Sequence, residues 1–126
     1  MTAQILVVDD EPDLEALVLQ KFRHQIRDGT INFLFAHDGV EALAALKAHG
    51  AVDLVVTDIN MPRMDGYEVI RQLRQNSVHK TTPILVLTTE SDADKRNLAR
   101  QAGATGWMVK PFDPDSLIAT VRKVAP

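Results

Sequence analysis

The sequence contains no cysteine, which excludes a disulfide framework, a thiolate nucleophile and a zinc–thiolate site. Aromatic residues are also scarce, at 5% of the chain, so the core is expected to be mostly aliphatic. No apolar run approaches the roughly 20 residues of a membrane span, and acidic residues interrupt the short apolar run at the N-terminus, unlike in a signal peptide. These absences predict a cytoplasmic protein with no membrane partner.

Positive charge is in slight deficit, with 14 Lys and Arg residues against 17 Asp and Glu residues. The resulting formal charge of -3 provides no global electrostatic reason to bind nucleic acid directly. A hydrophobic share of 45% and a charged share of 25% are ordinary for a globular chain, and 126 residues is a common length for one domain. Because no linker, repeat or low-complexity tract divides the chain, we expect a single domain over residues 1–126.

Short β-branched apolar runs alternate along the chain with longer stretches whose apolar residues lie three and four positions apart. The runs predict strands and the stretches predict helices. Five such units with short connections imply an α/β fold: a five-stranded parallel sheet, doubly wound as a (βα)5 three-layer sandwich. The flavodoxin-like strand order 2-1-3-4-5 is the common choice for this length. The predicted strands cover residues 5–8, 31–35, 52–56, 84–87 and 107–109.

Proline and glycine mark several of the expected helix boundaries. Pro12 lies near the start of the first helix, Gly50 and Gly103 follow the second and fourth, and Asp113-Pro114 precedes the last. The expected apolar stripes are Leu14, Leu17, Val18 and Phe22; Val40, Leu43, Ala44 and Leu46; Val69, Ile70 and Leu73; Leu98 and Ala102; and Leu117, Ile118 and Val121.

Polar residues come directly after four of the five predicted strands. In a doubly wound sheet, sites form at the carboxyl ends of the strands, near the point where the strand order reverses. The first and third strands are neighbours in the expected order, so the acidic residues after them should converge there. The residues in question are Asp9, Asp10 and Glu11 after the first strand, Thr57 and Asp58 after the third, Thr88 and Thr89 after the fourth, and Lys110 and Pro111 after the fifth.

The expected cluster of Asp9, Asp10 and Asp58 calls for a cation. Two carboxylates ~5 Å apart in an effective dielectric of ~20 repel by roughly 3 kcal/mol. Lys110 is one available cation; a bound divalent ion is another, and a small all-oxygen ligand set suits Mg²⁺ (or Mn²⁺). An aspartate carboxylate can also attack a phosphoryl group. Asp58 is the best nucleophile candidate, because it stands alone after a central strand.

Four motifs, in the order LVVDDEP, TDINMPRMDG, LTTE and ATGWMVKPF, resemble the receiver domain of two-component response regulators, a CheY-like family. The resemblance covers essentially the whole chain. It implies that Asp58 accepts a phosphoryl group from the phosphohistidine of a histidine kinase or phosphotransfer protein. It also implies a phosphoacceptor signalling domain with self-catalysed transfer and autodephosphorylation rather than an enzyme, and no output domain is expected in these 126 residues.

The resemblance also implies a metal ligand set. Asp10 and Asp58 are expected to supply carboxylates to Mg²⁺, and Asp9 is expected to act mainly through a bridging water. Asn60 is expected to contribute its backbone carbonyl.

Further roles follow from the resemblance at the phosphoryl group. Thr88 is expected to donate a hydrogen bond to it and Lys110 to pair with it. The Lys110-Pro111 peptide bond is expected to be cis. Asn60 and Glu90 occupy positions that govern access of the attacking water, and they predict a short-lived phosphoryl form.

Trp107 occupies the switch position of the family, where Tyr or Phe is more common. The resemblance implies that Thr88 moves toward the phosphoryl group and that the aromatic side chain turns inward. The surface formed by the last two helices and the strand at residues 107–109 would then change for an unknown protein target, with dimerisation on phosphorylation as a further expectation. The alternative is that Trp107 only packs on the last strand.

Other functions fit these motifs poorly. A flavin carrier shares the fold class, but the acids of DDEP would repel its phosphate, and a haloacid-dehalogenase-like phosphatase needs a D-x-D pattern. No nucleotide-binding glycine motif is present. Two alternatives stay open: a receiver fragment of a larger regulator or hybrid kinase, and a receiver that binds proteins independently of phosphorylation.

Overall fold

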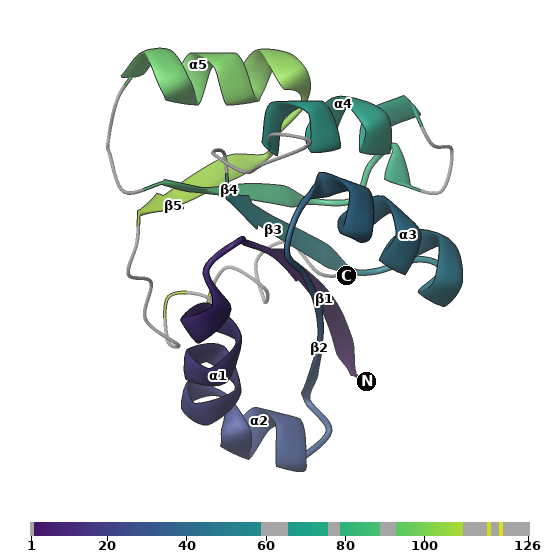
Figure 1. Ribbon diagram of the computed structural model, residues 1–126, viewed down its shortest axis with the longest axis vertical. Coiled ribbons are helices and arrows are strands. Elements are labelled where there is room, and N and C mark those ends of the chain that lie inside the picture. The colour runs from purple at the N-terminus through teal and green to yellow at the C-terminus, as the bar shows by residue number, and fades with distance from the viewer. Residues whose placement is uncertain are drawn as a thin grey trace.

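The computed structural model describes residues 2–58, 66–75, 79–88 and 93–109, together with residues 116 and 119. Strands and helices alternate along the chain, with one additional short helix after the first (Figure 1). The elements are β1 (Ala3–Val8), α1 (Pro12–Lys21), α2 (Arg23–Arg27), β2 (Ile31–Ala36), α3 (Gly39–His49), β3 (Leu54–Asp58), α4 (Gly66–Gln75), β4 (Ile84–Thr88), α5 (Ala93–Ala102) and β5 (Gly106–Val109).

All five strands pair in parallel in the order β2-β1-β3-β4-β5, which confirms the predicted topology. The register aligns Val8 of β1 with Thr57 of β3, and Asp58 with Leu87 of β4. The carboxyl ends of β1, β3 and β4 therefore lie at the same edge of the sheet. The strand order reverses between β1 and β3, which is where ligands bind in open α/β sheets.

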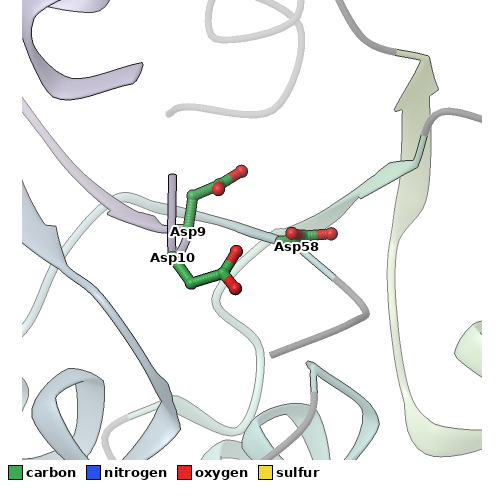
Figure 2. A group of neighbouring side chains, drawn as sticks. All are labelled: Asp9, Asp10 and Asp58. Atoms are coloured by element: carbon green, nitrogen blue, oxygen red, sulfur yellow. The ribbon is translucent and has the colours of Figure 1, made fainter. Parts of the chain in front are cut away.

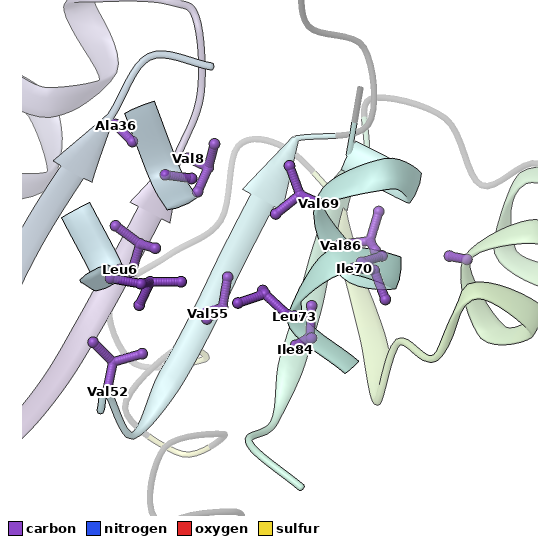
Figure 3. Packing of buried hydrophobic residues seen from close by; sticks show 13 residues of the cluster. Leu6, Val8, Ala36, Val52, Val55, Val69, Ile70, Leu73, Ile84 and Val86 are labelled. Atoms are coloured by element: carbon purple, nitrogen blue, oxygen red, sulfur yellow. The ribbon is translucent and has the colours of Figure 1, made fainter. Parts of the chain in front are cut away.

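Helices cover both faces of the sheet, because its central strands are apolar on both sides. One face packs against α3 and α4, and the other packs against α1 and α2 (Figure 1). Figure 3 shows the first of these cores, in which α4 places its buried side chains over β3 and β4. The strand residues in this core are Leu6, Val8, Ala36, Val55, Ile84 and Val86, and those on the opposite face are Ile5, Val7, Ile31, Phe33, Leu54, Val56, Leu85 and Leu87.

The third strand begins and ends two residues later than the predicted range 52–56. Asp53 precedes the strand and pairs with β1 through its side chain: the Gln4 amide donates to Asp53 Oδ2 at 2.7 Å, and the Asp53 amide donates to the Gln4 carbonyl at 2.8 Å. As a result, Thr57 and Asp58 belong to β3 itself rather than following it.

Phe22, the last position of the first predicted stripe, lies directly after the end of α1, and α2 follows it. Phe22 lies between the two helices and is fully buried, with its ring edge-on to Phe33 at a centroid distance of 5.2 Å. Its amide still donates to the Val18 carbonyl at 3.0 Å, and the Ile26 amide donates to the Phe22 carbonyl at 2.9 Å. The helix therefore bends at the residue that anchors it in the core.

Four predicted stripe positions are wrong: Leu17, Val40 and Leu98 are 40%, 44% and 49% exposed, and Ala44 is exposed as well. In α3 the buried side chains are Ala42 and Leu46, one helical turn apart. The fourth stripe is displaced by one residue, because Ala99 is buried where Leu98 was expected. The α4 stripe of Val69, Ile70 and Leu73 is confirmed, and the last predicted stripe lies outside the described residues.

Three of the predicted helix ends agree with the structure, and the fourth, at Asp113-Pro114, lies outside the described residues. Pro12 starts α1, and Gly50 and Gly103 follow α3 and α5 with positive φ values of 82° and 115°. Asp38 caps α3, since its side chain accepts the Glu41 amide at 2.9 Å. None of the helices in the described ranges is long and apolar enough to cross a membrane.

Candidate functional site

Three aspartates meet at the carboxyl ends of β1 and β3. Asp9 and Asp10 directly follow β1, and Asp58 is the last residue of β3. One carboxylate oxygen from each residue lies within 4.8 Å of the other two. Figure 2 shows the three side chains gathered at these neighbouring strand ends. The predicted convergence of Asp9, Asp10 and Asp58 is therefore confirmed.

Backbone contacts hold Asp9 firmly. Its amide donates to the Ala36 carbonyl at 3.0 Å, which ties it to the end of β2. Its Oδ1 atom accepts the Glu11 amide at 2.9 Å, which orients the carboxylate. Asp9 is 4% exposed, Asp58 is half-buried and Asp10 is exposed. The cluster thus has a rigid buried side at Asp9 and opens to solvent at Asp10.

The spacing of the three carboxylates supports a divalent metal site. Oxygen atoms bound to one Mg²⁺ at 2.0–2.1 Å are separated by roughly 3 to 4 Å, and the observed atoms lie within 4.8 Å of one another. Without a cation, such carboxylates repel each other by roughly 3 kcal/mol per pair at ~5 Å in an effective dielectric of ~20. An oxygen-only donor set is also the one that hard divalent cations prefer.

Thr57 is a supporting residue whose contact the sequence did not predict. It is fully buried in β3, and its hydroxyl donates to the Asp58 carbonyl at 3.0 Å. The only signal was a polar side chain beside a run of three apolar residues. This bond acts on the main chain at the point where it leaves β3, so Thr57 helps to fix the direction in which Asp58 is presented.

A small pocket lies beside the cluster, on the side of α1. Asp9, Glu15 and His37 are among the residues that line it. The His37 ring lies between two carboxylates, with Nε2 at 3.5 Å from Glu15 and Nδ1 at 3.2 Å from Glu41. The side chains of His37, Glu15 and Glu41 are about half-exposed. Their contacts therefore link α1 and α3 across the end of β2 without burying charge.

The remaining predicted site residues divide into two groups. Trp107 lies in β5 opposite Val86 of β4, is 39% exposed, and borders a shallow hollow with Ala99 and Arg100 of α5. The backbone of Thr88 ends β4, but its side chain lies outside the described part of the structure. Four further predicted residues also lie outside the described residues: Asn60, Glu90, Lys110 and Pro111.

With this geometry established, comparisons with known proteins show a consistent likeness. A model of the response regulator receiver domain matches residues 5–122. The response regulator MprA of Mycobacterium bovis is 40% identical over 122 residues, which are 97% of this chain and 50% of that protein. The chain therefore spans about half the length of the curated relatives it matches.

Solved structures give the same result. The chemotaxis protein CheY4 of Vibrio cholerae is 39% identical, with a TM-score of 0.85, over 98% of this chain and 99% of that chain. The receiver domain of the sensor histidine kinase PA1611 of Pseudomonas aeruginosa, which has a magnesium ion coordinated in its active-site cleft, has a TM-score of 0.84 over 98% of both chains. Its identity is 23%, so that likeness shows the shared fold.

Proposed function

The chain belongs to the response regulator receiver domains of two-component signalling systems, and on this premise we propose that Asp58 is its phosphoacceptor. A receiver domain is a signalling phosphoacceptor rather than a classical enzyme. The observation that carries the proposal is the position of Asp58 at the end of central strand β3, half-buried, with the Asp9 and Asp10 carboxylates converging on it.

The proposed reaction is phosphoryl transfer from a phosphohistidine. A carboxylate oxygen of Asp58 attacks the phosphorus atom, the new O–P bond forms as the N–P bond breaks, and the imidazole nitrogen keeps the electron pair and takes a proton from solvent. Later attack by water breaks the O–P bond, releases inorganic phosphate and restores the carboxylate. Positioning and electrostatic stabilisation supply most of the catalysis in such transfers.

The divalent metal that we propose for the cluster is Mg²⁺, with Mn²⁺ as the substitute. Asp10 and Asp58 would hold it through carboxylate oxygens, Asp9 would act through a bridging water, and Asn60 would contribute its backbone carbonyl. When bound, the ion neutralises charge on the oxygens of the transferring phosphoryl group. The oxygen spacing and the exposed opening at Asp10 support this assignment.

Residues outside the aspartate cluster complete the proposal. Thr88 donates a hydrogen bond to the phosphoryl group and Lys110 pairs with it. Asn60 and Glu90 govern access of the attacking water, which gives a short-lived phosphoryl form. The Lys110-Pro111 peptide bond is proposed to be cis. The backbone of Thr88 at the end of β4, next to β3, supports its part in this arrangement.

Trp107 and the surface around it are proposed to respond to phosphorylation and to contact the downstream protein. Receiver domains partner with histidine kinases. For this chain we propose a downstream protein target that contacts α5, β5 and the segment after β5, and dimerisation on phosphorylation as a further response. The half-exposed indole of Trp107 beside α5 supports this location. A single receiver domain over residues 1–126, located in the cytoplasm, remains the proposed organisation.

The phosphoacceptor assignment is tested by incubating the protein with a small-molecule phosphodonor and Mg²⁺, followed by mass spectrometry of the intact chain. The wild type is expected to gain one phosphoryl group, and Asp58→Asn none, because an amide is not a nucleophile for phosphorus. Asp28→Asn is the matched control, since Asp28 is an exposed aspartate after α2.

Two outcomes would contradict the assignment. One is a wild type that takes up no phosphoryl group, which favours a receiver that binds proteins independently of phosphorylation. The other is an Asp58→Asn variant that is labelled as fully as Asp28→Asn.

A further inference from the structure

Arg74, in the last turn of α4, binds main-chain carbonyls from two separate segments. Its Nε atom donates to the Gly103 carbonyl at 2.9 Å. Its Nη1 atom donates to the carbonyls of His79 at 2.9 Å and Thr82 at 2.6 Å, with a longer contact of 3.3 Å to the Lys80 carbonyl. One side chain thus connects α4 to the segment before β4 and to the turn between α5 and β5.

The two segments that Arg74 contacts lead directly into β4 and β5. Immediately beyond them, the Ile84 amide donates to Thr105 Oγ1 at 3.0 Å and the Thr105 amide donates to the Ile84 carbonyl at 2.8 Å. Arg74 therefore contacts both segments next to the point where the ladder between these strands begins.

The turn after α5 fits closely around Arg74. Gly103 has a φ of 115°, and a Cβ atom built on it would lie 2.8 Å from Cγ of Arg74. An L-residue at this position is disfavoured both by the backbone conformation and by the side chain of Arg74. Gly103 therefore packs against the side chain of Arg74 and also accepts a hydrogen bond from it.

The environment of Arg74 suits a guanidinium that binds backbone rather than a carboxylate. The ion pairs found among the described residues do not include Arg74, and burial lowers its pKa below the ordinary arginine value. The group lies near the C-terminal ends of both α4 and α5, where carbonyl dipoles favour a cation. Its planar fork presents several N–H donors in fixed directions, which lysine does not.

We propose that Arg74 is a positioning residue for the output side of the molecule: it holds the α5–β5 turn, and through it Trp107, in the resting arrangement. Trp107 follows that turn and borders the hollow formed by Ala99 and Arg100 of α5, so a displaced turn changes its surroundings. The aspartate cluster lies at the opposite ends of the strands. The link to signalling rests on the proposed function, whereas the link between Arg74 and Trp107 does not.

The experiment uses the indole itself, because Trp107 is the single tryptophan of the chain. In Arg74→Met, acrylamide quenching of Trp107 fluorescence is expected to rise about twofold in the absence of phosphodonor, since local opening becomes easier. Arg74→Lys should give an intermediate rise. Arg71→Met is the matched control on the same helix, because Arg71 is exposed and pairs only with Glu68 among its described contacts.

A loss of general stability is separated from positioning by a core variant. Leu46→Ala removes buried volume from α3, away from the α5–β5 turn, and is expected to lower stability while leaving quenching at the wild-type value. The proposal is overturned if Arg74→Met has the quenching of the wild type, or no more than that of Arg71→Met or Leu46→Ala. Arg74→Lys decides the question in the same way if Arg74→Met does not fold.

Phosphoryl uptake is measured on the same samples. Arg74→Met is expected to take up a phosphoryl group as readily as the wild type. Failure of uptake in every sample contradicts the proposed function and leaves the comparison of Trp107 quenching intact. Normal uptake with unchanged quenching contradicts the role of Arg74 alone.

Discussion

Asp58 is supported through its main chain. Its main-chain carbonyl accepts the hydroxyl of fully buried Thr57. Thr57 pairs with Val8 of β1, and Asp58 pairs with Leu87 of β4. The main chain of Asp58 is thus held beside Asp9, whose carboxylate accepts the Glu11 amide. Pre-positioning of this kind would favour the metal binding and the attack on phosphorus that we propose for Asp58.

His79 is another residue whose chemistry depends on its surroundings. It is 2% exposed, and within the described part of the chain neither ring nitrogen has a hydrogen-bond partner. Burial, and then the positive charge of Arg74, lower the pKa of His79 below its usual value of 6.5. The imidazole is therefore neutral in the folded protein near pH 7.

This environment predicts a pH dependence of stability. Because the pKa of His79 is lower in the folded state, the unfolded chain binds a proton first, and the free energy of unfolding should fall as the pH drops below 6.5. The fall should level off below the lowered pKa. Urea denaturation between about pH 7.5 and 5 measures it. His79→Leu should make the free energy of unfolding depend less on pH, whereas a variant at exposed His49 should keep the dependence of the wild type. If His79→Leu showed an equally steep dependence, His79 would not be its cause.

At the scale of elements, the helix ends marked by proline and glycine were predicted better than the helix faces. Proline, glycine and aspartate act locally at helix ends, so Pro12, Gly50 and Gly103 were placed correctly. Whether a side chain faces the core depends on how the helix lies on the sheet. That is why Leu98 was expected inside and Ala99 is found there.

The cap of α3 offers a measurable case. Asp38 is almost fully buried and its carboxylate accepts the Glu41 amide, so Asp38→Ala is expected to cost about 1 kcal/mol of folding free energy. Asp38→Asn keeps an acceptor oxygen and should lose much less. Chemical denaturation of the wild type and both variants measures these differences. If Asp38→Ala were as stable as the wild type, the cap would contribute nothing.

At the scale of the whole molecule, the sheet brings together charges that the net value of -3 conceals. Three carboxylates from two strands share one rim, and their repulsion opposes folding when no cation is bound. A ligand that binds only the folded state stabilises it, by about 2.7 kcal/mol at a concentration of 100 times its Kd. Metal binding and folding are therefore coupled.

This coupling predicts that Mg²⁺ raises the thermal midpoint of the wild type and that a chelator reverses the rise. Asp58→Asn and Asp10→Asn should each raise the midpoint without Mg²⁺, because a repulsive charge is removed, and should reduce the gain on adding it. Asp28→Asn should behave like the wild type. A gain of equal size in all the variants would indicate a general salt effect instead of a site.

The sequence by itself determined the parts of this protein that arise from local chemistry. Strands buried on both faces require continuous apolar runs, and helices end where glycine adopts a positive φ, so both are visible in short windows. The acidic motif after the first strand and Asp58 were visible in the same way.

Only the tertiary structure decided which further pieces meet. The expected strand order already brought Asp9 and Asp10 to Asp58, whereas the break between α1 and α2 at Phe22, whose ring packs edge-on against Phe33, is visible in no local pattern. The hydrogen bond from Arg74 to the Gly103 carbonyl joins segments that are distant in sequence. Such contacts depend on the summed packing of the whole sheet and its helices, and no local pattern encodes them.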